Sequence, residues 1–438
     1  MTLSPSSSES RSHRVLAGIR NGFADYAGKL RLFSHNARLY LINTILVGMM
    51  MGIYQLLFNF YVLSLGYDEI MAGRLLTISS LVALAGALPA GYIGDRIGRK
   101  AALLLSNAML CVSLLGIVWL HSPDELIIWN IISGLGQSLM GVTMGPFLME
   151  NSGEEERTYL FSFGAGLRMT TAFFGNWLGG HLPTWWGSLL GIAPTDPEAY
   201  GATLLCVAVL LFLALIPLLM LRGRRPHDAL DSPSQSPLEF AIKNPRLLAK
   251  LVSPMLLISV GAGLFMPFMN LFFRTMHDRS DASIGSLFAW GSLMMAVGLM
   301  IAPPLAERIG KMRLVITSQA LSIPFLVMLG FSPWYWLSAA AYLIRVALMN
   351  MSGPVYDTFV MERVDESARA TVASLVSMCW NFGWAFSPTL SGWVQVRYGF
   401  DPVFLGTIST YILAILLYRW FFWHDNETSQ SQEAIARD

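Results

Sequence analysis

The sequence predicts an all-α polytopic membrane protein whose twelve transmembrane helices form two pseudo-symmetric six-helix bundles. The first observation is composition: hydrophobic residues make up 54% of the chain and charged residues only 13%, whereas soluble domains carry about 25% charge. The second is a series of apolar stretches long enough to cross a bilayer. The third is a set of short motifs that recur at one spacing. We therefore expect two copies of one helical unit in a membrane.

Stretches of spanning length define the individual helices. A helix that crosses the hydrocarbon layer needs about 20 predominantly apolar residues. Stretches of this kind, with few or no charges, occur twelve times, and an even number places both termini on one side. The expected spans lie near residues 39–65, 75–94, 101–120, 126–149, 158–181, 199–221, 251–273, 282–306, 314–331, 334–361, 370–396 and 402–420.

The distribution of lysine and arginine predicts the orientation. If the termini are cytoplasmic, the cytoplasmic segments hold 23 Lys and Arg residues, and the opposite face holds four. Because basic residues are enriched in cytoplasmic loops, we expect a multi-pass protein of the plasma (inner) membrane with both termini in the cytoplasm. Its expected parts are a cytoplasmic N-terminal segment at 1–38, an N-terminal six-helix half at 39–221, a cytoplasmic linker at 222–250, a C-terminal six-helix half at 251–424 and a cytoplasmic tail at 425–438.

A charged loop between two apolar stretches has a second copy later in the chain. Asp95, Arg96, Gly98 and Arg99 correspond to Glu307, Arg308, Gly310 and Lys311. The same offset relates Glu150 to Glu362, Arg157 to Arg369 and Gly180 to Gly392. Independent matches at one offset predict that the two halves are copies of one fold, related by an axis along the membrane normal.

With the spans, the halves and the loop taken together, the chain resembles the major facilitator superfamily over roughly residues 36–424. The signature of that family between helices 2 and 3, G-x-x-x-D-R-x-G-R-[KR], is matched at every fixed position by Gly91, Asp95, Arg96, Gly98, Arg99 and Lys100. The resemblance implies a substrate cavity between the halves near the bilayer midplane. It also implies that the cytoplasmic loops form a latch, which holds the outward-open state.

The residues of the loop indicate how such a latch would work. Gly98 permits a turn too tight for a side chain, and Asp95 can accept hydrogen bonds from a neighbouring helix N-terminus. The bases can pair with the carboxylate that ends helix 4, Glu150. The second half repeats these parts, so the predicted gate comprises Gly91, Asp95, Arg96, Gly98, Arg99, Lys100, Glu150, Arg157, Glu307, Arg308, Lys311, Glu362 and Arg369.

Arg168 and Arg345 fall inside predicted helices. At about 1.5 Å rise per residue, each lies roughly 15 Å along its helix, near the midplane. A charge at this depth costs several kcal/mol and usually serves a function. We interpret the pair as cations that bind an anionic or strongly polar group of a substrate. The alternative is that each arginine braces adjacent helices; the two interpretations weigh equally for Arg345, and bracing is preferred for Arg168.

Neutral polar residues at membrane depth supply further candidates for substrate binding. Gln55 and Asn59 share one face of helix 1, and Asn130 and Gln137 share a face of helix 4, because residues three, four or seven apart lie on one side of a helix. Trp380 and Asn381 lie on helix 11. For each of them, interhelical hydrogen bonding or packing is the favoured interpretation over ligand contact.

The sequence predicts a secondary active transporter that moves a small molecule by alternating access, with an anionic or amphipathic substrate. A proton-coupled multidrug or lipophile exporter, or a lipid flippase, of the same fold is the alternative, although helix 5 has Asn176 where drug exporters of the family typically have proline. A membrane sensor that does not transport is the alternative of another class. We expect no enzymatic activity, no metal site, no cofactor and no nucleic-acid partner, and we expect a monomer that contacts membrane lipids.

Overall fold

The computed structural model describes residues 33–150, 154–221, 244–364 and 369–423. Most of the predicted N-terminal segment, most of the linker and the tail lie outside these residues. So do the side chains at 148–150, 154–159, 161–162, 369–371 and 373–374. Within the described part every regular element is a helix, as the predicted fold class requires.

Six helices form the N-terminal half. Each begins and ends close to a predicted span, although the fifth is longer than expected and runs for 37 residues. The helices are α2 His35–Ser64, α3 Glu69–Ile97, α4 Arg99–Trp119, α5 Pro123–Glu150, α6 Glu154–Leu190 and α7 Pro197–Met220.

The C-terminal half repeats this arrangement with one break. The predicted seventh span is not continuous: a 3₁₀ turn divides it at Pro267, which has no N–H to donate. The elements are α9 Pro245–Phe265, η1 Met266–Phe268, α10 Met269–His277, α11 Asp281–Ile309, α12 Lys311–Phe331, α13 Tyr335–Glu362, α14 Arg369–Tyr398 and α15 Asp401–Phe422.

Polarity is concentrated in three of the twelve transmembrane segments. Among the described residues, nine segments are long and apolar enough to cross a membrane by length and composition alone. The other three are α6, α13 and α14, which carry Arg168, Arg345 and Asn381 respectively. The helices that depart from the apolar pattern therefore hold both predicted arginines, whereas the predicted amides Gln55, Asn59, Asn130 and Gln137 lie on α2 and α5, which are among the nine.

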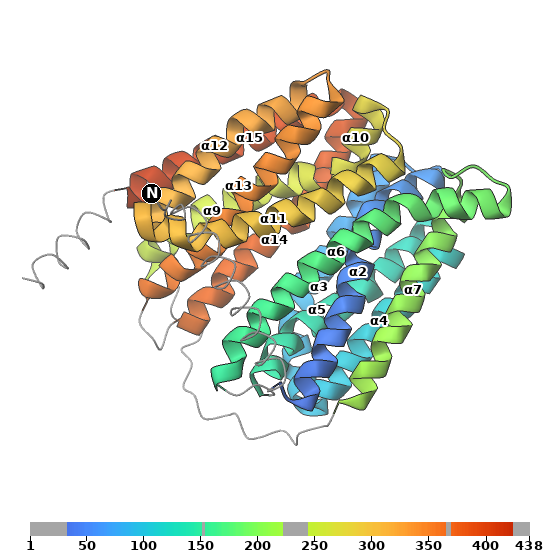
Figure 1. The fold of residues 1–438 in the computed structure, drawn as a ribbon, viewed down its shortest axis with the longest axis horizontal. Helices are drawn as coiled ribbons and strands as arrows, with labels where there is room; N and C mark the ends of the chain where they lie inside the picture. The colour runs from blue at the N-terminus through green and yellow to red at the C-terminus, as the bar shows by residue number, and fades with distance from the viewer. Residues whose placement is uncertain (1–32, 151–153, 222–243, 365–368, 424–438) are drawn as a thin grey trace, which may run out of the picture.

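The two halves converge at one end of the molecule and diverge toward the other (Figure 1). We call the diverging end, where α7 ends and α9 begins, the linker end, and the converging end, where α10 lies, the far end. Two helix pairs make the main contact between the halves, α3 with α14 and α6 with α11. A buried apolar cluster continues across the far end, from Leu56 and Phe60 of α2 to Phe268 and Phe272.

The contacts between the halves confirm the internal repeat. A Cβ atom on Gly73 of α3 would overlap the carbonyl oxygen of Pro388, and a Cβ atom on Gly285 of α11 would overlap the carbonyl oxygen of Asn176. The offset that relates Asp95 to Glu307 also relates Gly73 to Gly285, and it relates Asn176 to Pro388. The two helix crossings are thus one contact made twice, and in both the absence of a side chain lets the backbones touch.

Candidate functional site

The gate loops adopt the same turn in both halves. Gly98, between α3 and α4, has φ of 85°, and Gly310, between α11 and α12, has φ of 90°. Residues with a side chain rarely adopt this conformation. The tight turn predicted at Gly98 is present, and its copy occupies the equivalent place.

Ion pairs connect some of the predicted gate charges at the linker end. Asp95 pairs with Arg99 at 2.7 Å, and its side chain is 65% exposed. In the second half Lys311 pairs with Glu362, which joins the α11–α12 turn to the end of α13. The side chains of Glu150, Arg157 and Arg369 lie outside the described residues, so the corresponding pair in the first half is not seen.

Lys100 binds the end of α7, a contact that the sequence analysis did not include. Its Nζ donates to the carbonyl oxygens of Leu219 and Leu221 at 2.7 and 2.8 Å. The last carbonyls of a helix have no partner within the helix and attract a cation.

The remaining gate residues lie around the two turns. Arg96 stands over the ring of Tyr92 at 5.0 Å. Glu307 and Arg308 are exposed, and a Cβ on Gly91 would meet open space.

Arg168 lies on the stripe of α6 that faces both α2 and α11. The stripe continues through Ala172 and Asn176, which follow at helical spacing. Gly52 of α2 packs against both of these residues, and Asn176 also donates to Ser292 of α11 at 3.2 Å. Arg168 is exposed, and its guanidinium makes no hydrogen bond or ion pair with a described residue.

Trp380 occupies the position on the other half that is equivalent to Arg168 in the repeat. The stripe of α14 that begins at Trp380 continues through Trp384 to Pro388, which contacts Gly73 of α3. Trp380 is 36% exposed, and the neighbouring Asn381 is exposed too. The carbonyl of Trp380 accepts a hydrogen bond from Ser259 of α9, which anchors the backbone at this point.

Two amides of the N-terminal half are exposed in the same way. Gln55 lies between Gly52, which packs on α6, and Asn59, which bonds to the C-terminal half. Gln137 of α5 donates to Ser133 at 3.2 Å. We refer to these exposed groups together as the inner polar set: Gln55, Gln137, Arg168, Trp380 and Asn381.

Arg345 lies apart from the inner polar set, inside the C-terminal half. Its side chain is 2% exposed. The guanidinium stands 4.5 Å from the ring of Phe265 and donates to the hydroxyl of Tyr411 at 3.3 Å. Nε has no partner among the described residues. Arg168 is thus the exposed arginine of the two and Arg345 the one that packs between helices, whereas the sequence analysis preferred bracing for Arg168 and weighed both interpretations equally for Arg345.

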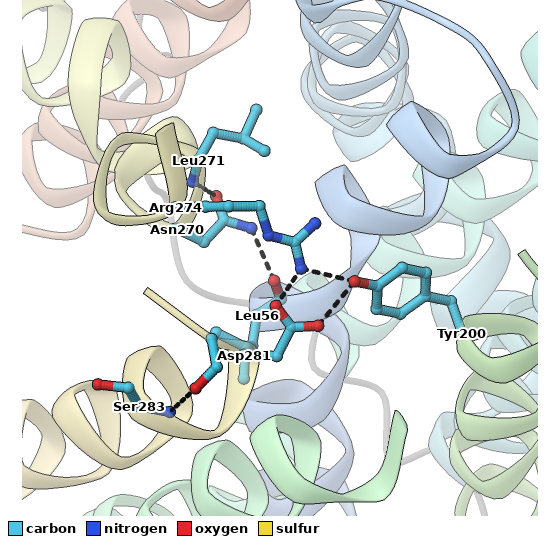
Figure 2. Close-up of polar contacts among 8 residues, drawn as sticks. Leu56, Tyr200, Asn270, Leu271, Arg274, Asp281 and Ser283 are labelled. Carbon is cyan, nitrogen blue, oxygen red and sulfur yellow. Dashed lines mark hydrogen bonds and ion pairs between the residues drawn. The ribbon is translucent and has the colours of Figure 1, made fainter. Parts of the chain in front are cut away.

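Two other candidates are also engaged in packing. Asn130 is 1% exposed and donates to the carbonyl of Leu126 in its own helix at 2.8 Å. Asn59 donates to Pro267 O at 2.5 Å and to Asn270 Oδ1 at 3.1 Å, across the boundary between the halves. The sequence analysis did not single out Asn270, although the separation of 211 residues between Asn59 and Asn270 differs by only one from the spacing of the repeat. A second cross-half group that it missed surrounds Arg274 and Asp281 (Figure 2).

Two six-helix bundles with equivalent crossings, a charged turn in each and exposed polar groups on their membrane-spanning helices define a membrane transporter. The family model of the Major Facilitator Superfamily matches residues 40–280 and 255–437. The chain belongs to the Major Facilitator Superfamily.

Relatives of known name are multidrug resistance proteins. The chain is 24% identical over 336 residues to the multidrug resistance protein MdtG of Proteus mirabilis (strain HI4320), covering 75% of this chain and 80% of the relative. It is 24% identical over 363 residues to MdtG of Enterobacter lignolyticus (strain SCF1), covering 79% and 82%.

Solved structures share the fold. The nucleoside transporter NupG superimposes with a TM-score of 0.72 at 15% identity, covering 89% of this chain and 99% of that one. The D-xylose–proton symporter has a TM-score of 0.69 at 18% identity, covering 87% and 97%. A bacterial homologue of the human lysosomal transporter Spinster, in an inward-facing and unoccupied conformation, has a TM-score of 0.70 at 13% identity, covering 89% and 95%. The chain is a multi-pass secondary transporter that moves a small molecule.

Proposed function

We propose that the transported molecule is amphipathic and carries an anionic or strongly polar group, which Arg168 binds. The observation that carries this proposal is the exposed guanidinium of Arg168 between the halves, without a partner among the described residues. Its position in the repeat is taken by Trp380 on the opposite half. A cation and an indole at equivalent positions suit a molecule with a charged end and an apolar body.

The physical argument concerns the cost of the charge. An arginine at membrane depth is expensive unless water or an anion accompanies it. Water accompanies Arg168 while the halves are apart at the linker end. When they close there, a bound carboxylate or phosphate would replace the water through paired N–H donors. The ring of Trp380 would cover apolar surface, and the amides of Gln55, Gln137 and Asn381 would accept or donate hydrogen bonds.

The predicted orientation sets the side from which substrate enters. With both termini in the cytoplasm, the linker end, toward which the halves diverge in Figure 1, faces the cytoplasm. The gate charges Asp95 and Arg99 lie at this end, with Asp95 65% exposed. We place the protein in the inner membrane as a monomer, because both halves of the path come from one chain.

Transport into liposomes tests the role of Arg168. Purified protein is reconstituted and assayed with organic anions, sugars, cationic drugs and lipids, with and without a pH gradient. We expect transport of an amphipathic anion, with Arg168→Gln reducing the rate at least tenfold and Arg168→Lys retaining part of it. Arg397→Gln is the control, because Arg397 is another exposed arginine but lies on α14 at the opposite end from the gate charges, at 4.5 Å from the ring of Trp393. Equal transport by Arg168→Gln and the wild type would refute the proposal.

A multidrug exporter is the second candidate, and the names of the two MdtG relatives favour it. In this case the apolar surfaces around Trp380 would select the substrate, and Arg168 would contribute little. Efflux confined to cationic lipophiles and unchanged in Arg168→Gln would favour this candidate over the anion transporter.

A further inference from the structure

Arg274, Asp281 and Tyr200 meet at the far end (Figure 2), and Phe60 packs against the same group. Arg274 of α10 and Asp281 of α11 form an ion pair within the C-terminal half. Tyr200 of α7, in the N-terminal half, donates to Asp281 Oδ2 at 2.7 Å and accepts from Arg274 at 2.5 Å. The guanidinium also stands 3.4 Å from the ring centre of Phe60 on α2. The charged pair thus belongs to one half and docks onto a hydroxyl and a ring of the other.

The repeat shows that this group is an addition to the fold. A symmetric contact exists beside it. Asn59 donates to the carbonyl of Pro267, three residues before Asn270. Asn270 in turn donates at 2.7 Å to the carbonyl of Leu56, three residues before Asn59. The charged group has no such copy. At the offset of the repeat, Glu69 corresponds to Asp281, but Val62 corresponds to Arg274 and Ile412 to Tyr200.

We infer that the Arg274–Asp281 pair is a releasable catch, which docks onto Tyr200 and Phe60 and holds the far end of the transporter shut. We call these four residues the far-end catch. Asp281 is 6% exposed, and Tyr200 and Phe60 are fully buried in the closed arrangement. The inference rests on the alternating-access function, since a transporter of this kind must open its far end in each cycle.

The division of charge between the halves explains how the catch can release. A buried ion pair loses much of its stability when one partner is removed. Here both partners belong to the C-terminal half, close together in the chain, and can stay paired while the halves separate. Within the catch, the pair loses only its contacts with the hydroxyl of Tyr200 and the ring face of Phe60. Water at the opened end can hydrate the charged groups in place of both. Opening therefore breaks polar contacts that are recovered when the end closes, and it leaves no charge unpaired.

The substitution Tyr200→Phe tests the catch, because it removes one hydroxyl and keeps the ring. Cys111, Cys206 and Cys379 are first replaced by serine. Spin labels are then placed at Thr195 and Pro333, which are exposed on far-end loops of the two halves, and pulsed electron spin resonance measures the distance between them. We expect the ratio of far-end-open to far-end-closed molecules to rise at least about tenfold, because one hydrogen bond to a charged group is worth about this factor and the Tyr200 hydroxyl makes two.

Tyr61→Phe is the matched control for the tyrosine. Tyr61 is equally buried in the same half, but its hydroxyl bonds only to Ile117, Val118 and His121 of that half among the described residues. A second matched pair concerns the acid: Asp281→Asn should shift the ratio further than Tyr200→Phe, because Arg274 loses its counter-charge. Glu69→Gln, at the equivalent position, should leave the ratio unchanged.

Labels at Ile97 and Ile309 report on the linker end in parallel, since both are exposed and lie at equivalent positions of α3 and α11. Release of the catch predicts that this distance shortens as the far-end distance grows. The inference would be overturned if the distance between the labels at Thr195 and Pro333 had the same distribution in Tyr200→Phe as in the wild type and in Tyr61→Phe. The distances are measured without substrate, so this result is independent of whether Arg168 binds an anion.

Discussion

At the scale of single residues, the two intramembrane arginines have contrasting surroundings. Arg168 is exposed on the stripe between α2 and α11, whereas Arg345 is 2% exposed and contacts Phe265 and Tyr411. Both are arginines inside a long helix, so their sequence contexts look alike. Their difference depends on helix rotation, which decides whether a side chain points between the halves or into one of them.

The surroundings of Arg345 predict a loss of stability when its partner is removed. Tyr411→Phe deletes the hydroxyl that accepts from the guanidinium at 3.3 Å and leaves a buried donor of a charged group unsatisfied. We expect the free energy of unfolding to fall by about 1–3 kcal/mol, as measured by denaturant unfolding in detergent, while transport per folded molecule is retained. Tyr92→Phe, at an exposed tyrosine, serves as the control. A selective loss of transport at unchanged stability would instead assign Arg345 to the substrate path.

At the scale of elements, glycine contacts set how closely the helices of the two halves approach. The equivalent crossings of α3 with α14 and of α6 with α11 bring backbone against backbone at Gly73 and Gly285. A methyl group at either position would overlap a main-chain carbonyl, which cannot move aside as a flexible side chain can.

We therefore expect Gly285→Ala to lower the fraction of molecules that are closed at the far end. We expect the labels at Thr195 and Pro333 to report a longer mean distance, and the transport rate to fall several-fold because one state of the cycle is destabilised. Gly353→Ala is the control, because a Cβ on this glycine of α13 would meet open space. If the two variants give the same distance, the crossing tolerates a side chain and the argument fails.

The broken seventh segment shows why an element can escape sequence analysis. Proline also lies inside α3, α7, α12 and α14, which remain continuous. At Pro267 the carbonyl accepts from Asn59 of the other half, and Asn270 Oδ1 accepts from the N–H of Leu271. Contacts of this kind satisfy backbone groups that a break leaves unpaired. The break therefore depends on a residue of the other half, far away in the chain.

At the scale of the whole molecule, the arrangement of charges predicts the topology. The 23 Lys and Arg residues assigned to the cytoplasmic side, against four on the other, predict that both termini lie in the cytoplasm. A protease-sensitive tag at either terminus should be cleaved in inside-out membrane vesicles and protected in right-side-out vesicles. A tag in the loop between α6 and α7 should show the opposite pattern. Cleavage of a terminal tag in intact right-side-out vesicles would reverse the proposed direction of the open side.

The sequence by itself determined the twelve segments, their division into two halves, the repeat and the charged turns at Gly98 and Gly310. These features depend on local hydropathy, on residue types that permit a turn, and on comparing the chain with itself. The tertiary structure decided which polar groups face one another: Arg168 toward open space, Asn59 onto Pro267, and Tyr200 onto Arg274 and Asp281. The reason is that hydropathy states how much of a helix is apolar, whereas rotation and crossing angle, which arise only when helices pack, determine the partner of each side chain.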